Sequence, residues 1–134
     1  MREARAFIFA AEEDFGIVPL EAQGEGTPVI ALGRGGARET IITTGAAPTG
    51  LFFSRPEPAE IFAAVTAFLR TEERYSEFHC WRNAMRFSEE RFISAFSDHV
   101  RRELTSFRER MQLGREWAPG GVIAKSWREG YDLT

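Results

Sequence analysis

The sequence contains few of the residues that form disulfides, metal sites or nucleic-acid-binding surfaces. Its single cysteine, Cys80, excludes an internal disulfide and is typical of a reducing compartment. No two aspartates form an Asp-x-Asp pair that would chelate a divalent ion, and His79 and His99 lack the spacing of a zinc site. The formal net charge of −3 argues against a nucleic-acid-binding protein. We therefore expect no metal ion, no cofactor and no nucleic-acid partner.

Long apolar runs and catalytic triad motifs are also absent. No run is long enough to cross a bilayer, and no cleavable signal is recognisable. No Ser/His/Asp or Cys/His arrangement points to nucleophilic catalysis. The 134 residues, of which 43% are hydrophobic and 12 are phenylalanine, suffice for a core in one domain or part of one. These features predict a soluble, cytoplasmic protein.

The first ordered segment has the pattern of a strand followed by a turn and a helix. The run from Arg5 to Ala11 is short, apolar and bounded by charge, which predicts a parallel strand buried on both faces. A turn follows, and Pro19 suits the first turn of a helix over residues 17–24. In open α/β sheets, ligands bind where strands end and helices begin, because the unpaired amides and the helix dipole attract anions and hydroxyls.

Two glutamates flank this strand-to-helix turn, eight positions apart. Glu13 lies in the turn, where an ionised carboxylate accepts hydrogen bonds from sugar hydroxyls. Glu21 lies on the predicted helix, close enough to its start to reach a vicinal diol such as that of ribose. The alternative interpretation is that both acids are solvated and only stabilise the start of the helix.

The segments that follow resemble those of a known family. After Glu21 come Gly26-Thr-Pro-Val-Ile-Ala31 and the glycine pair of Gly35-Gly36-Ala-Arg-Glu39. Farther on come Pro48-Thr-Gly-Leu-Phe-Phe53 and Asn83-Ala-Met-Arg-Phe-Ser-Glu-Glu-Arg-Phe92. In this order they resemble the retaining glycosyltransferases of the family 4 type, which have an E-x7-E motif and two Rossmann-like domains (the GT-B fold). The resemblance covers roughly residues 5–97.

This resemblance implies a nucleotide-sugar donor site. It implies that Glu13 positions the donor sugar, that Glu21 holds the ribose, and that Gly35 and Gly36 allow backbone to approach a diphosphate. The loop residues between the two glutamates would complete the site: Asp14, Phe15, Gly16 and Ile17. The reaction would be retaining, metal-independent glycosyl transfer from GDP-mannose or a UDP-sugar, with the nucleotide sugar as substrate and no further cofactor.

The chain departs from the family pattern in two places. Gly24-Glu25 stands where the family often has Ala-Cys. Only twelve residues precede Glu13, so we expect the acceptor-binding domain and the Arg and Lys that clamp the diphosphate to be missing. Arg34 and Arg38 are candidates for a partial replacement, or are solvated loop arginines. The alternative function is therefore a non-catalytic remnant or interaction module that keeps the fold.

The second half of the chain is predicted to be helical. A helix begins near Pro58, and Ser88 followed by two glutamates is typical of an N-cap. From there an apolar stripe continues, which indicates a core or partner-helix contact: Phe92, Phe96, Val100, Leu104, Phe107 and Met111.

The expected fold class is therefore α/β, a partial Rossmann-like domain with a short parallel sheet flanked by helices and a helical C-terminal half. We assign residues 1–113 to the truncated donor domain and residues 114–134 to an irregular tail. Three strands are expected, near residues 5–11, 28–32 and 50–53. Because so small a sheet has exposed edges, we expect a homodimer or a companion chain.

Overall fold

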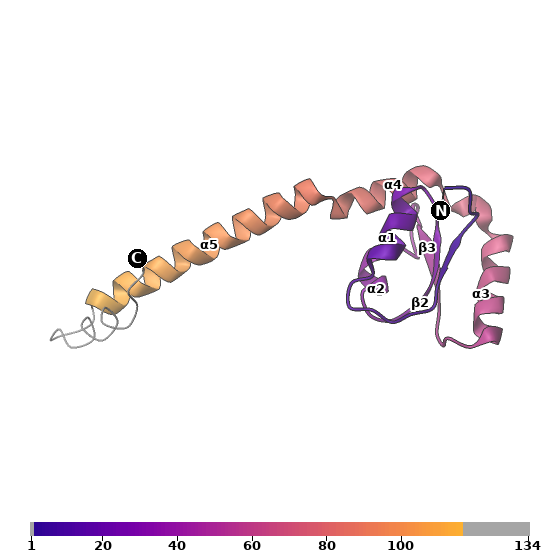
Figure 1. Cartoon of the computed structure of the whole chain (residues 1–134), viewed down its shortest axis with the longest axis horizontal. Helices are drawn as coiled ribbons and strands as arrows, with labels where there is room; N and C mark the ends of the chain where they lie inside the picture. The colour runs from indigo at the N-terminus through magenta and orange to yellow at the C-terminus, as the bar shows by residue number, and fades with distance from the viewer. Residues whose placement is uncertain (1, 117–134) are drawn as a thin grey trace, which may run out of the picture. The chain divides into compact units, whose positions relative to one another are not determined.

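The structure is a computed structural model that describes residues 2–116. It divides into two units at Phe92, and each is described here by itself. The first unit is an α/β domain, and the second continues as one long helix, α5 (Figure 1). Within the described residues, no helix is long and apolar enough to span a membrane.

Three parallel strands form the sheet of the first unit. They are β1 (Phe7–Phe9), β2 (Val29–Leu32) and β3 (Gly50–Phe53), in the order β1-β2-β3. In register, Phe7 pairs with Val29, and Val29 pairs with Gly50. The expected α/β class and the three parallel strands are confirmed.

The expectation that the first strand is buried on both faces is wrong. Only Phe9 of β1 is buried, while Ile8 is 47% exposed. β1 is an edge strand, and the face of the sheet on which Ile8 lies is less covered there than the face on which Phe9 packs. All four residues of the central strand β2 are buried. Short apolar composition predicted a strand here but not its place in the sheet.

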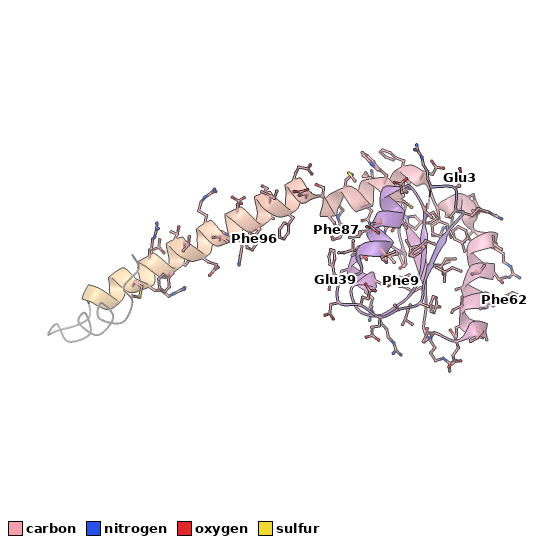
Figure 2. All side chains as sticks on the ribbon, viewed as in Figure 1. Glu3, Phe9, Glu39, Phe62, Phe87 and Phe96 are labelled. Atoms are coloured by element: carbon pink, nitrogen blue, oxygen red, sulfur yellow. The ribbon has the colours of Figure 1, made fainter. Side chains whose placement is uncertain are left out.

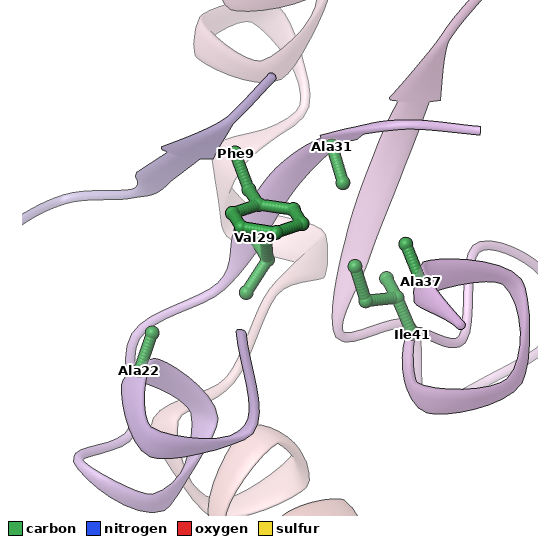
Figure 3. Packing of buried hydrophobic residues seen from close by; sticks show 6 residues of the cluster. All are labelled: Phe9, Ala22, Val29, Ala31, Ala37 and Ile41. Carbon is green, nitrogen blue, oxygen red and sulfur yellow. The ribbon is translucent and has the colours of Figure 1, made fainter. Parts of the chain in front are cut away.

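Helices cover both faces of the sheet because successive β2 side chains point to opposite faces. On one face, α1 (Ile17–Gly24) and α2 (Ala37–Thr40) supply residues to one apolar cluster (Figure 3). Its members are Phe9, Ala22, Val29, Ala31, Ala37 and Ile41. On the other face, α3 (Pro58–Arg70) packs Ala64 and Phe68 against Ile30 and Leu32. The predicted helices over residues 17–24 and from Pro58 are confirmed.

Shorter helical segments lead from α3 to α5. They are η1 (Glu72–Arg74), α4 (Glu77–Ala84) and η2 (Met85–Phe87). The Arg91 amide donates to Ser88 Oγ at 3.4 Å, which confirms Ser88 as the N-cap of α5 (Glu89–Glu116). Hydrogen bonds from its own backbone and from Ser88 lower the pKa of Glu90.

The apolar stripe of α5 is exposed and does not form part of a buried core. Its side chains, including Phe96, project from the helix surface (Figure 2). Their exposed fractions run from 39% to 65%. The members are Phe92, Ile93, Phe96, Val100, Leu104, Phe107 and Met111. The described part of α5 reaches Glu116, so residues 114–116 of the expected tail are helical, and the rest of that tail lies outside the described residues.

Candidate functional site

The loop between β1 and α1 (residues 10–16) lies where β1 ends and α1 begins. Gly16 is its last residue and has φ of 78°, a left-handed conformation that disfavours other residues. As the N-cap of α1, Gly16 has no side chain to accept from the first amides of the helix. These amides therefore remain as donors at the positive end of the helix dipole.

The glycine loop (residues 33–36) packs directly against the backbone of the β1–α1 loop. The Gly36 amide donates to the Glu13 carbonyl oxygen at 2.8 Å. A Cβ at Gly35 would collide with that same oxygen, and one at Gly36 would lie 2.5 Å from the Phe15 Cα. Gly35 also has φ of 55°. These contacts give the glycine pair a structural role in holding residues 13–15, a role that the sequence did not suggest.

The two glutamates flank the loop on the protein surface. Glu13 lies in the β1–α1 loop and Glu21 in the second turn of α1, and both side chains are exposed. Among the side chains that the structure describes, those of residues 2–111, neither carboxylate has a hydrogen-bond or ion-pair partner. Both carboxylates are thus unused acceptors, the kind of group that binds hydroxyls.

The other predicted site residues divide into exposed side chains and buried backbone. Asp14 is exposed, and the side chains of Phe15 and Ile17 are 45% and 63% exposed. Gly16 and Gly36 are buried, whereas Gly35 is exposed. The structure therefore brings the glycine pair against residues 13–15, whereas Glu21 lies in the second turn of α1, the helix that follows this loop.

A buried polar network beneath the site was missed from the sequence. Asn83 Nδ2 donates to Gln23 Oε1 at 2.7 Å and to the Thr40 carbonyl oxygen at 2.8 Å. Gln23 Nε2 donates to the same Thr40 oxygen at 3.1 Å, and Arg86 Nη1 donates to Asn83 Oδ1 at 2.9 Å. The Thr40 hydroxyl donates to the Gly36 carbonyl oxygen at 3.1 Å, so the network extends to the glycine loop.

The exposure of Glu25 shows why the Gly24-Glu25 departure is tolerated. Gln23, which precedes Gly24 in the chain, is fully buried. Glu25 lies just past the end of α1, and its side chain is exposed. The charge therefore lies in solvent and not in the core. The glutamine at position 23, within a run of small residues, was the only sequence signal of this buried network that we identify. Its partner Asn83 could not be predicted, because it lies 60 residues away in the chain.

An aromatic contact joins the β1–α1 loop to η2, which lies about 70 residues later in the chain. Phe15 and Phe87 meet edge to face with ring centroids 5.8 Å apart. The Arg86 guanidinium lies 5.6 Å from the centroid of the Phe87 ring. The segment η2 thus contacts Phe15 directly, while Asn83, just before it, contacts the helix that follows the loop.

The neighbouring ionisable groups have different environments. Arg34 Nη1 lies 3.8 Å from Glu12 Oε2. Because both side chains are exposed, this ion pair contributes little to the free energy of folding. Cys80 is buried in α4, and burial raises the pKa of its thiol to about 12. Among the described residues no group of three or more His, Cys, Asp or Glu could hold a metal ion.

Comparison with known proteins gives one family and several relatives. The family described as "Glycosyl transferases group 1" matches residues 1–80. D-inositol 3-phosphate glycosyltransferase of Geodermatophilus obscurus is 34% identical over 126 residues, which are 93% of this chain and 26% of that protein. The alpha-1,3/1,6-mannosyltransferase of Eremothecium gossypii is 46% identical over 44 residues, 32% of this chain and 9% of that protein. The chain thus spans about a quarter of its first relative.

A solved structure agrees with the fold. Sucrose-phosphate synthase from Thermosynechococcus elongatus superposes with a TM-score of 0.56 at 23% identity. The likeness covers 74% of this chain and 25% of that one. At this identity it supports the shared α/β architecture.

Proposed function

Since the chain belongs to the glycosyl transferases group 1 family, we propose that its first unit is the donor side of a glycosyltransferase and binds a nucleotide sugar. The match to this family confirms the resemblance to glycosyltransferases that the sequence predicted. The observation that supports the donor site is the set of unused hydrogen-bonding groups around the β1–α1 loop. They comprise the exposed carboxylates of Glu13 and Glu21 and the uncapped amides at the start of α1.

The roles of the groups follow from their positions. Glu13, in the loop, accepts hydrogen bonds from hydroxyls of the donor sugar, and the amides of residues 14–17 surround the same end of the donor. Glu21, one turn into α1, accepts from the ribose diol. The diphosphate lies beside the glycine loop, whose exposed Gly35 offers backbone without a Cβ. The uncapped amides at the start of α1 are fixed donors at the positive end of the helix dipole, and they can also stabilise the negative charge that develops on a leaving diphosphate.

We further propose that transfer is retaining and needs no metal ion. The acceptor then attacks the face of the sugar that the nucleotide leaves, and amide donors take the part that a divalent cation plays elsewhere. GDP-mannose and UDP-sugars are the candidate donors. A mannosyltransferase among the relatives supports mannose. The free Cys80 supports a cytoplasmic site of action.

Calorimetric titration with GDP, UDP and their sugars tests the donor site. We expect Glu21→Ala to weaken nucleotide binding roughly tenfold to hundredfold, because hydrogen bonds to a charged group contribute about 1.5 to 3 kcal/mol. Glu13→Ala should leave GDP binding unchanged and remove the added affinity that the sugar provides. Glu25→Ala, an exposed glutamate just past the end of the same helix, is the matched control.

Two outcomes would contradict the donor site. One is the absence of binding at millimolar nucleotide, which would favour the alternative of a non-catalytic interaction module. The other is equal weakening by Glu21→Ala and Glu25→Ala, which would reduce the effect to general electrostatics. Retained binding with separate effects on nucleotide and sugar would support the assignment of one glutamate to each part.

A second proposal concerns self-association through α5. The exposed stripe of α5 is large for a surface left in water. Residues 89–100 carry three acids and one arginine, whereas residues 101–111 carry four arginines and two glutamates. Antiparallel pairing with a second copy brings the acidic half against the basic half, so we propose a homodimer. Light scattering at micromolar concentration tests it, and a monomer, or a complex only with a companion chain, would contradict it.

A further inference from the structure

A pocket of about 580 Å³ opens at the carboxyl ends of β2 and β3. Gly33 and Ser54, the residues that directly follow these strands, both line it. The other lining residues are Arg38, Ile41, Ile42, Thr43, Thr44, Phe52 and Phe53. The ends of parallel strands are where α/β domains place ligands, and the volume lies within the range of about 300 to 1,000 Å³ for small-molecule sites.

The pocket is separate from the proposed donor site. Neither of the two glutamates, nor any residue of α1 or of the β1–α1 loop, belongs to its lining. The glycine loop has a part in each site. Gly33 faces this pocket, whereas Gly36 packs against the backbone of Asp14 and Phe15.

The pocket lining offers unused donors. Arg38 is exposed, and its guanidinium has no hydrogen-bond or ion-pair partner among the described side chains of residues 2–111. The same holds for the hydroxyls of Thr43, Thr44 and Ser54. Arg55 differs, since it pairs with Glu57 and Glu60 at 3.4 and 3.0 Å. A guanidinium without a carboxylate suits an oxyanion, above all a phosphate, which it can bind through two parallel hydrogen bonds.

The remaining walls suit a ring larger than a phosphate. Ile41 is buried, and Ile42 and Phe52 are half-buried, so they present apolar surface beside the hydroxyls. Sugar rings combine C–H faces that pack on apolar walls with hydroxyls that bond to threonine and serine. An inorganic phosphate alone would leave most of the volume and these walls unused.

We propose that this pocket binds a phosphorylated monosaccharide, with the phosphate on Arg38 and the sugar hydroxyls on Thr43, Thr44 and Ser54. The ring lies against the apolar wall that includes Phe52. The site stands independently of the donor site, because it uses other residues and a ligand without a nucleoside.

The test is a titration of the full chain with glucose 6-phosphate, followed by amide shifts in ¹H–¹⁵N spectra. We expect shifts at Gly33, Thr43, Thr44 and Ser54, and we expect Arg38→Gln to weaken binding tenfold or more. Arg55→Gln removes an equal charge close to the pocket but outside its lining, so it should leave binding unchanged. Glucose and inorganic phosphate should each bind more weakly than the phosphorylated sugar.

Several results would overturn the proposal. They are the absence of shifts at about 10 mM ligand, equal weakening by Arg38→Gln and Arg55→Gln, and binding of inorganic phosphate as tight as that of glucose 6-phosphate. If Arg38→Gln does not fold, Thr43→Val decides, because it removes one hydroxyl at constant shape and should weaken binding severalfold. A parallel GDP titration shifts residues 13–17, so failure of one site is distinguishable from failure of the other.

Discussion

Replacing Gly36 by alanine is the sharpest test of how the site is held together. The backbone of Gly36 is helical, with φ of −62° and ψ of −19°, so alanine suits its conformation. The added Cβ would nevertheless lie 2.5 Å from the Asp14 carbonyl oxygen and from the Phe15 Cα. These are backbone atoms, so one of the two loops must move. Any loss of stability therefore comes from the collision alone.

The structure offers a matched control for this substitution in Gly24. Gly24 is the last residue of α1, and a Cβ there would meet no atom within 4 Å. Gly24→Ala should therefore stabilise the fold by about 0.5 to 1 kcal/mol, because it reduces the freedom of the unfolded chain. Gly36→Ala should destabilise it by about 1 to 3 kcal/mol, the usual cost of overpacking. The same chemical change is thus expected to have opposite signs.

Urea unfolding followed by circular dichroism measures both variants. The midpoint should rise for Gly24→Ala and fall for Gly36→Ala, with an unchanged slope. Nucleotide-sugar affinity should fall only for Gly36→Ala, because only this variant displaces residues 13–15. An unfolding midpoint for Gly36→Ala at or above that of the unmodified chain would refute the close packing of the two loops.

Further predictions concern three groups of the first unit. Asn83→Ala leaves the buried Gln23 Oε1 without its donor and should lower the free energy of unfolding by about 1 to 3 kcal/mol in urea titrations. The Cys80 thiol, with its pKa raised from 9.0 to about 12, should react with a thiol reagent at pH 8 roughly a thousandfold more slowly when folded than when unfolded. Because the folded thiol resists ionisation, its contribution to stability is complete below pH 9.0 and should be lost as the pH rises toward 12. Phe87→Ala removes the edge contact to Phe15, and faster hydrogen exchange of the loop amides should report the loosened loop.

Each of these predictions has its own control. Glu73→Ala, an exposed change in η1, should alter unfolding by less than about 0.5 kcal/mol, and a loss equal to that of Asn83→Ala would deny the network a special role. Cys80→Ala should remove the loss of stability above pH 9.0, and its persistence would assign that loss to other groups. Unchanged exchange at the Gly36 amide, which donates to Glu13, would show that Phe87 does not support the loop.

The local elements could be predicted because their signals lie within a few residues of one another. The helix over residues 17–24 was placed by its turn and by Pro19, and it was confirmed with these bounds. Ser88 and the acids after it fixed the start of α5, since capping needs only the neighbouring turn. The apolar runs around β2 and β3 identified two of the strands. The proposed roles of Glu13 and Glu21 stay predictions.

Tertiary structure decided what these elements contact. The burial of β1 depended on its place at the sheet edge, which an apolar run does not encode. The packing of the glycine pair against residues 13–15, and the bond between Asn83 and Gln23, join segments that are far apart in sequence. Sequence alone thus determined where the main helices and strands lie, because the periodicity and capping that specify them act over one or two turns. The support beneath the site needed the fold, because long-range hydrogen bonds and steric contacts arise only once the sheet has brought the segments together.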